Sequence, residues 1–413
     1  MSAGQLLKQA NRLKREGRLN EAITLYHQAI EINPNFAWTY YELGDALVKQ
    51  DKFDTAVAYL QKAVELKCDF HFAYQELANV FQKQEKLDEA IRYYNLSLEN
   101  QQTSHTISQT LISDKVYFDK VKSYQNSYET IVENGKWIDH PFYVSIETFS
   151  SCNAACNFCP YPSLERQGTK MSENLFEKIV NELSSREGYA LPLINLSRVN
   201  EPFLDKRIFD FINFVNSKLP KTKIQYFTNA SVLDDKKLEK LLSTKNTNFL
   251  KISFNDYRPK EYEEVMRIPF DRTYRNVKHI HDRKLAGDVN FSVRLGRVGD
   301  GTTADNDFLK WAKKVFPLFE AVVTPRFDWI GKVKVPVFPI LGIVGCFQWF
   351  ELHFLSNGKE AFCCIDSDGV NGRGDANYQN VFDIYNHPYR KSLRLQKISR
   401  KDVGVCSKCS ALA

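Results

Sequence analysis

Three cysteines, Cys152, Cys156 and Cys159, lie within eight positions of one another in the stretch CNAACNFC. Structural zinc sites usually take four ligands grouped as two pairs, and no fourth cysteine or histidine lies near this triplet in the sequence. A cubic 4Fe-4S cluster, by contrast, can be held by three thiolates while its fourth iron stays open. The spacing therefore favours an iron–sulfur cluster with one open coordination position.

The elements that must position this triplet are strands alternating with amphipathic helices. The expected strands are 142–148, 191–197, 223–229, 249–254, 290–298 and 321–329, and the helices between them include a helical region over 262–284. This alternation predicts a parallel sheet or partial barrel covered by helices. Functional groups in such folds gather at the carboxyl ends of the strands. The triplet directly follows the first strand, so we expect it at that edge.

The triplet and the strand before it resemble the radical S-adenosylmethionine (SAM) enzymes. In that family the open iron binds the amino and carboxylate groups of SAM. An electron from the cluster then cleaves SAM to a 5′-deoxyadenosyl radical, which abstracts hydrogen from carbon. The resemblance implies an enzyme with a 4Fe-4S cluster and SAM as cofactors. It does not identify a catalytic acid, base or hydrogen donor.

Further positions match the family in order along the chain and imply contacts to SAM. Phe158 matches the residue beside the adenine, and Asn200 and Glu201 stand where the family meets the methionyl amino group, although the family's two glycines are missing here. Thr228-Asn229 matches the end of the third strand. Ser253 is expected at the ribose and Arg294 at the SAM carboxylate.

The C-terminal part carries a second group of cysteines: Cys346, Cys363, Cys364, Cys406 and Cys409. Ser356-Asn357-Gly358 predicts a hairpin turn between two strands, which brings Cys346 near the far end of the second strand. The segment resembles the SPASM or shorter twitch extensions of radical SAM enzymes, which implies one auxiliary 4Fe-4S cluster. A structural zinc ribbon is the alternative, because four thiolates suit zinc equally well.

Cys363 and Cys364 are not both expected to bind the same cluster, because adjacent residues of a strand point to opposite faces. The family pattern counts five residues from the turn glycine and slightly favours Cys363. The eighteen-residue step from Cys346 to Cys364 also occurs among twitch enzymes. Both cysteines therefore stay candidates.

The first hundred residues repeat with a period of 34. Small residues recur in two registers: Ala22, Ala56 and Ala90 in one, and Ala10, Gly44 and Ala78 in the other. This resembles the tetratricopeptide repeat, a helix-turn-helix unit that stacks into a solenoid with a concave binding face. We expect three repeats over 1–103, a capping helix and linker over 104–140, the barrel over 141–335 and the auxiliary domain over 336–413.

The composition narrows the class of partner. A net charge of +6 over 413 residues, with both signs interspersed, argues against a dedicated nucleic-acid binder. No apolar run is long enough to span a membrane, and the N-terminus is predicted to be an amphipathic helix rather than a signal peptide. A cytoplasmic protein with mostly reduced cysteines is expected.

Together these features predict an α + α/β protein: an all-α repeat solenoid, a partial (β/α)6 barrel and a small cysteine-rich β-hairpin extension. The leading hypothesis is a radical SAM oxidoreductase or maturase that acts on a C–H bond of a peptide or protein. Its electron donor would be a low-potential protein such as flavodoxin or ferredoxin. The first alternative is a radical SAM dehydrogenase or epimerase of a sugar or other small metabolite. The second is a non-catalytic repeat adaptor or redox sensor.

Overall fold

The structure is a computed structural model that describes residues 2–84, 86–99, 128–133, 135–333, 345–396, 398, 400–406 and 409. The chain divides into two compact units, Met1–Lys120 and Val121–Ala413. Most of the expected capping helix, and the expected boundary at 335/336, lie outside the described residues.

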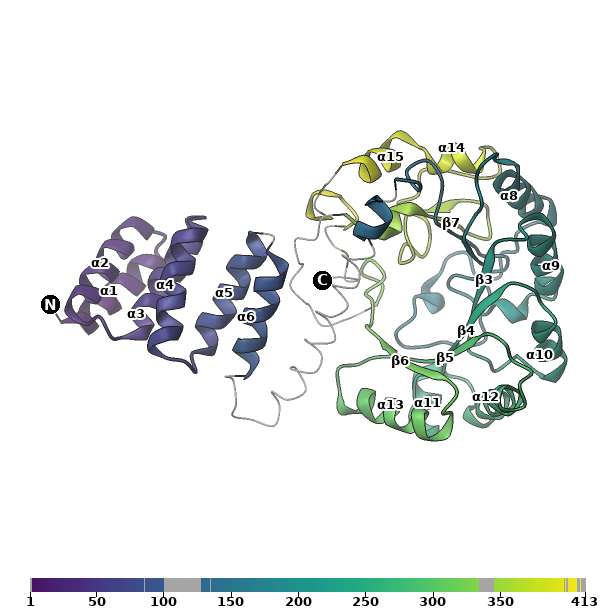
Figure 1. Ribbon diagram of the computed structural model, residues 1–413, viewed down its shortest axis with the longest axis horizontal. Helices are drawn as coiled ribbons and strands as arrows, with labels where there is room; N and C mark the ends of the chain where they lie inside the picture. Colours follow the sequence, from purple (N-terminus) through teal and green to yellow (C-terminus); the bar gives the residue numbers. More distant parts are fainter. Residues whose placement is uncertain are drawn as a thin grey trace. The chain divides into compact units, whose positions relative to one another are not determined.

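The first unit consists of helices that pack in consecutive pairs (Figure 1). They are α1 (Ala3–Arg15), α2 (Leu19–Ile32), α3 (Ala37–Val48), α4 (Phe53–Leu66), α5 (His71–Lys83) and α6 (Leu87–Glu99). The small residues of the 34-residue period are buried where helices meet. A Cβ placed on Gly44 would lie 2.6 Å from Leu60 Cγ, so α3 and α4 approach more closely there than a larger residue allows.

The second unit is built on a sheet of parallel strands with helices on its outer face (Figure 1). The strands are β1 (Tyr143–Ile146), β2 (Leu193–Asn195), β3 (Lys223–Thr228), β4 (Thr247–Ser253), β5 (Ser292–Val298) and β6 (Glu320–Thr324). The helices are α8 (Glu173–Ser185), α9 (Ile208–Lys218), α10 (Asp235–Leu242), α11 (Pro259–Met266), α12 (Phe270–Leu285) and α13 (Thr303–Val315). This is the partial barrel that the sequence predicts.

The helical region expected over 262–284 is two helices, α11 and α12. Arg267 ends α11 in the left-handed region at φ 58°, and Pro269 precedes α12. The pattern of apolar residues continues through this break, so helical periodicity alone does not reveal it.

Each strand buries one face against the helices. Val144 and Ile146 of β1 belong to the main core, together with Ile194 of β2 and Leu250 of β4. Because successive side chains of a strand point to opposite faces, Tyr143, Ser145 and the other alternate residues lie on the inner face of the barrel. Polar groups on this inner face are therefore candidates for chemistry.

The C-terminal segment adds two strands to the same sheet. Strand β7 (Glu351–Phe354) pairs in parallel with β1, and β8 (Glu360–Ala361) pairs antiparallel with β7, which gives the order β6-β5-β4-β3-β2-β1-β7-β8. The predicted hairpin turn is present, with Leu355 N donating to Lys359 O at 2.9 Å. The short helices of this unit are η1 (Tyr161–Ser163), η2 (Pro202–Leu204), η3 (Phe347–Phe350), α14 (Val381–Tyr385), α15 (Pro388–Leu395) and η4 (Arg400–Asp402).

In the part of the chain that the structure describes, no helix combines the length and the apolar character needed to cross a membrane.

Candidate active site

The cysteine triplet lies on the loop after β1, and backbone hydrogen bonds hold this loop on two sides. Glu201 N donates to Ser151 O at 2.9 Å, which ties the loop to the segment after β2. Ala155 N donates to Met266 O at 3.2 Å, which ties it to the end of α11. The loop is thus fixed at the carboxyl edge of the sheet, as the sequence predicts.

Burial is the main influence on the ionisation of the three thiols. Burial raises the pKa of Cys152 to about 12 and that of Cys159 to about 11. Burial also raises the pKa of Cys156, and the charges of Cys159 and Cys152 raise it further. Since thiolates are the metal-binding form, a positively charged group must offset this cost. Three thiols on one loop suit a 4Fe-4S cluster that keeps one iron open.

Glu201 lies between the cysteine loop and the end of β3. Its carboxylate accepts hydrogen bonds from Thr228 Oγ1 at 2.8 Å, Asn229 N at 2.7 Å and Phe203 N at 3.3 Å. Burial raises the pKa of Glu201 to about 7, although these hydrogen bonds lower it. Asn229 Nδ2 in turn lies 4.0 Å from Cys152 Sγ. The structure therefore brings together three positions that the sequence predicted separately.

Asn200 lies beside the same loop, and Phe158 lies on it. Asn200 Oδ1 accepts from Arg198 N at 2.7 Å, whereas its Nδ2 is shielded from solvent and has no hydrogen-bond partner. This unused donor fits a polar ligand such as the methionyl part of SAM. Phe158 is half-buried, and its carbonyl accepts from Trp329 Nε1 at 3.1 Å.

A cavity of about 420 Å³ opens next to the cysteine loop. It is lined by Ala155, Cys156, Asn157, Cys159, Pro162, Ser163, Arg326, Lys332 and Val333. Two thiols of the triplet therefore face open space rather than packed side chains, and two basic residues stand at the same opening.

Ser253 and Arg294 lie on neighbouring strands, on the inner face of the barrel. Ser253 ends β4 and so stands at the same edge as the cysteine loop. Arg294 lies near the amino end of β5, and its Nε donates to Glu320 Oε2 at 2.7 Å. Their contacts with SAM stay predictions.

The C-terminal cysteines gather around a buried cation that the sequence analysis missed. Arg400 is 4% exposed, and burial would lower its pKa, but Cys346, Cys409, Cys406 and Cys363 together raise it. Four thiols from three separate segments therefore lie within electrostatic reach of one guanidinium. Arg400 is one of several basic residues in this tail, so nothing in the sequence singled it out in advance.

Cys363 and Cys364 have different surroundings. Burial raises the pKa of both, and that of Cys364 reaches about 12. The next contributions for Cys363 come from other cysteines, whereas Glu351 and then Arg198 act next on Cys364. Cys409 acts on both cysteines, and Cys406 also acts on Cys363, so the slight preference for Cys363 as the auxiliary ligand stays a prediction.

Within the described ranges, no three His, Cys, Asp or Glu side chains stand close enough to hold a single metal ion. The first cysteine group is therefore identified by its shared loop, and the C-terminal group by its common influence on Arg400, rather than by a preformed ligand geometry.

Arg198 connects the two cysteine groups and was also missed by the sequence analysis. Its Nη2 donates to the carbonyl oxygen of Cys363 at 3.0 Å, and its Nη1 donates to Ser145 Oγ at 3.3 Å. Three residues later, Glu201 holds the loop of the first cysteine group. One short segment after β2 thus contacts both groups.

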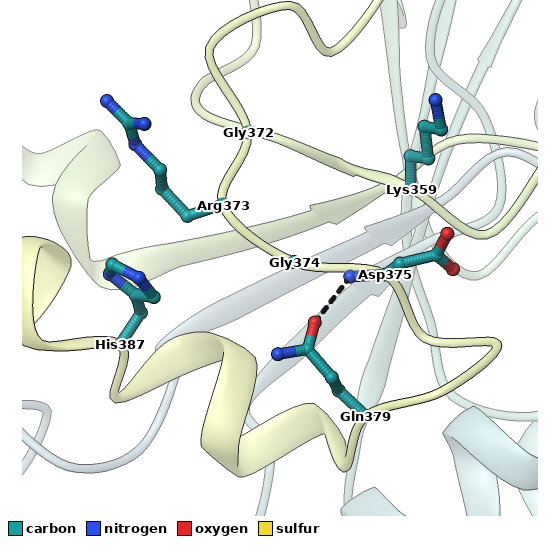
Figure 2. Close-up of a pocket in the computed structure, with 7 residues that line it drawn as sticks. All are labelled: Lys359, Gly372, Arg373, Gly374, Asp375, Gln379 and His387. Atoms are coloured by element: carbon teal, nitrogen blue, oxygen red, sulfur yellow. Dashed lines mark hydrogen bonds between the residues drawn. The ribbon is translucent and has the colours of Figure 1, made fainter.

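A second hollow, of about 510 Å³, lies on the surface of the C-terminal segment (Figure 2). It is lined by Lys359, Gly372, Arg373, Gly374, Asp375, Gln379 and His387, and Asp375 N donates to Gln379 Oε1 at 2.8 Å (Figure 2). None of the cysteines lines it, so it stands apart from the candidate active site.

Family profiles match both units of the chain. The Radical SAM superfamily profile matches residues 146–310. A TPR repeat profile matches residues 10–51, and a tetratricopeptide repeat profile matches residues 39–68 and 73–103.

Individual relatives match less extensively. The S-adenosyl-L-methionine-dependent 2-deoxy-scyllo-inosamine dehydrogenase of Niallia circulans is 27% identical over 99 residues, which are 24% of this chain and 39% of that protein. The chain therefore spans well under half the length of this curated relative.

Two solved structures align with the chain, and the first of them is similar in fold. Streptococcus suis SuiB bound to the precursor peptide SuiA is 16% identical, with a TM-score of 0.50 over 83% of this chain and 86% of that one. BtrN in complex with AdoMet and 2-DOIA is 17% identical, with a TM-score of 0.45 over 65% of this chain and 92% of that one.

Proposed function

We propose that this chain cleaves SAM reductively and uses the resulting radical to remove hydrogen from a C–H bond of a peptide or protein. The chain contains a radical SAM domain that follows N-terminal tetratricopeptide repeats. The radical SAM family implies SAM and a 4Fe-4S cluster as cofactors. Cys152, Cys156 and Cys159 would hold the cluster, and the cluster would supply the electron for SAM cleavage.

The observation that carries the proposal is the arrangement around Glu201. The buried carboxylate of Glu201 accepts hydrogen bonds from the end of β3, and the backbone N–H of Glu201 donates to the cysteine loop. Hydrogen bonds therefore join the loop, Glu201 and the end of β3. The chain's own residues would then orient SAM. Asn200 would donate its free Nδ2 group, Phe158 would lie beside the adenine, and Ser253 and Arg294 would provide further polar contacts.

The C-terminal cysteines support a reaction in which the substrate is oxidised. We assign one auxiliary 4Fe-4S cluster to Cys346, Cys363, Cys406 and Cys409, which would accept the second electron after hydrogen abstraction. The alternative is structural zinc at the same thiols. Iron and sulfide quantification separates them, because two clusters give about eight irons per chain and one cluster with zinc gives about four.

The repeats support a peptide or protein substrate, since an extended concave surface suits a long ligand. The similarity in fold to SuiB is consistent with this substrate class. The curated relative is named as a 2-deoxy-scyllo-inosamine dehydrogenase, so a small-metabolite substrate is the second candidate. A cytoplasmic location and a flavodoxin or ferredoxin as electron donor complete the proposal.

The test is reductive cleavage of SAM to 5′-deoxyadenosine by anaerobically reconstituted chain under dithionite. We expect turnover by the native chain and none by the Cys156→Ala variant, with Cys68→Ala as the matched control because Cys68 is exposed in the repeat unit. Absence of 5′-deoxyadenosine from the native chain with a full cluster would refute the proposal and leave the non-catalytic adaptor.

A further inference from the structure

A buried arginine and a buried tryptophan lie among the C-terminal cysteines with unused N–H groups. Arg400 is 4% exposed and Trp349 is 2% exposed. Arg400 Nε and Trp349 Nε1 are both shielded from solvent, and neither has a hydrogen-bond partner in the protein. A buried donor without an acceptor costs free energy, and a buried charge without a counter-charge costs more. Both groups therefore suit a negatively charged acceptor beside them.

Trp349 meets the cysteines in the hydrophobic core of the C-terminal segment. Trp349 and Cys406 belong to one cluster of buried residues, and Cys346 and Cys363 pack against the same cluster. Trp349 N donates to Cys346 O at 3.0 Å, which fixes the start of η3 beside that cysteine. The indole therefore lies among thiols that come from three separate segments of the chain.

Arg400 is held near the same cysteines by the backbone on both sides of it. Gly345 N donates to Ile398 O at 3.0 Å, so the segment that leads to Arg400 lies beside the segment that leads to Cys346. Val403 N donates to Arg400 O at 3.2 Å, and Val403 belongs to the same buried cluster as Trp349. Arg400 is thus built into the wall of the cysteine group.

The charge of Arg400 is matched by thiols rather than by a carboxylate. In the part of the chain that the structure describes, no ion pair joins Arg400 to an Asp or Glu side chain. Burial would lower the pKa of Arg400, whereas four C-terminal cysteines raise it. Burial raises the pKa of Cys406, and the charge of Arg400 together with the indole of Trp349 lowers it. Since a guanidinium stays protonated in proteins, Arg400 is a permanent positive charge within this group.

A buried positive charge and N–H donors have a defined effect on an iron–sulfur cluster. In the proposed function, one electron passes from the substrate radical, which is oxidised, to the auxiliary cluster, which is reduced. The cluster and its thiolates then carry one more negative charge. A nearby cation and N–H···S hydrogen bonds stabilise this reduced form more than the oxidised form, so they raise the reduction potential. Burial strengthens the effect because water screens the charge less.

We propose that Arg400 and Trp349 raise the reduction potential of the auxiliary cluster and thereby make it an electron acceptor for the substrate radical. This inference rests on the proposed function and specifies which residues adjust its oxidising step. Arg400 supplies the charge, and both residues supply N–H groups for thiolate sulfur. Neither residue is a ligand, so each can be changed while every C-terminal cysteine is kept.

The test is a potentiometric titration of the anaerobically reconstituted full chain, followed by electron paramagnetic resonance. The parent for this test carries Ala at Cys152, Cys156 and Cys159, so that the remaining signal comes from the C-terminal cysteines. We expect Arg400→Gln to lower the midpoint potential. At a given potential the ratio of reduced to oxidised cluster should fall about tenfold, which is ~59 mV for one electron. Arg400→Lys keeps the charge and should stay close to the parent's midpoint.

Two further variants complete the series. Trp349→Phe removes one N–H group and should lower the midpoint to a smaller extent than Arg400→Gln. The matched control is Arg373→Gln, because Arg373 is exposed in the same C-terminal segment and lines the second hollow, which no cysteine lines. This control should leave the midpoint of the parent unchanged.

Equal midpoints in the parent and in Arg400→Gln would overturn the inference. If Arg400→Gln binds too little iron for titration, Trp349→Phe decides, and an unchanged midpoint in that variant would count against the inference. Zinc at the C-terminal thiols, with no paramagnetic signal, would also overturn it. SAM cleavage depends on the first cysteine group, so a failure of the radical chemistry would be seen separately as missing 5′-deoxyadenosine from the native chain.

Discussion

The side chain of Arg198 donates to the carbonyl oxygen of Cys363 at 3.0 Å, across 165 residues of sequence. The same guanidinium contacts the carbonyl oxygens of Cys364 and Asp366 at 3.4 Å. Replacing Arg198 by Met leaves these acceptors without their charged partner, which should cost about 1–3 kcal/mol of unfolding free energy. We expect a lower melting temperature and less iron bound per chain, measured by calorimetry and iron analysis. Arg272→Met, at an exposed position of α12, should change neither quantity.

Cys363 and Cys364 should respond differently to replacement by serine. Cys363 shares its surroundings with Cys406 and Cys409, so Cys363→Ser should lower the iron content from about eight to about four per chain. Cys364→Ser should keep the full content, because Glu351 and Arg198 influence Cys364 more strongly than Cys409 does. The reverse result in anaerobically reconstituted protein would assign the auxiliary site to Cys364.

Glu201 should be sensitive to loss of its charge. In Glu201→Gln, an NH2 group replaces one carboxylate oxygen. This group donates hydrogen bonds, so it cannot accept one from Thr228, Asn229 or Phe203. We expect SAM to bind about tenfold more weakly to the cluster-loaded chain, measured by equilibrium dialysis. Unchanged affinity together with an unchanged melting temperature would show that Glu201 does not organise the SAM site.

The repeat unit should lose stability in acid because of Asp45. Burial would raise the pKa of Asp45, but hydrogen bonds from Lys14 and Lys49 outweigh burial and lower it. Since the folded pKa is below the unfolded value of about 3.9, Asp45 contributes stability above that pH, and the contribution disappears as the pH falls through the folded pKa. Thermal unfolding followed by circular dichroism should show a smaller acid-induced loss in Asp45→Asn than in the native chain. An equal loss in both would contradict this assignment.

Gly44 should not accept a larger residue. A Cβ at this position would lie 2.6 Å from Leu60 Cγ, and Leu60 is fully buried. Gly44→Val should therefore destabilise the repeats by about 1–3 kcal/mol through overpacking. Gly4→Val is the control, because a Cβ on Gly4 meets nothing within 4 Å. The measurement is the midpoint of urea unfolding, and similar midpoints for both variants would show that α3 and α4 can move apart.

The sequence predicts the strands, the outer helices and the cysteine triplet because each depends on local information. Alternation, the 34-residue period and the spacing of Cys152, Cys156 and Cys159 all lie within short stretches. The break at Arg267 was missed because the apolar pattern continues through it, although Pro269 is a local signal that ends or kinks a helix.

The contact between Ser145 and His353 could not be predicted from local patterns, because it joins residues that are 208 positions apart in the sequence. It depends on the register between β1 and β7, and the sequence alone does not state which strands become neighbours. A pattern was nevertheless present, because polar residues alternate with apolar ones at Tyr143, Ser145, Glu351 and His353. Such alternation in strands buried on both faces indicates an inner wall with polar groups.

The parallel pairing of β7 with β1 has a consequence for synthesis of this protein. Residues 351–354 leave the ribosome long after residues 143–146, so a nascent chain carries β1 with one edge unpaired while β2 to β6 assemble on the other. Unpaired strand edges promote association with other chains. A pause in translation before residue 351 should therefore leave this edge of β1 free to pair with other chains. Chaperones that shield nascent chains should then raise the yield of this protein.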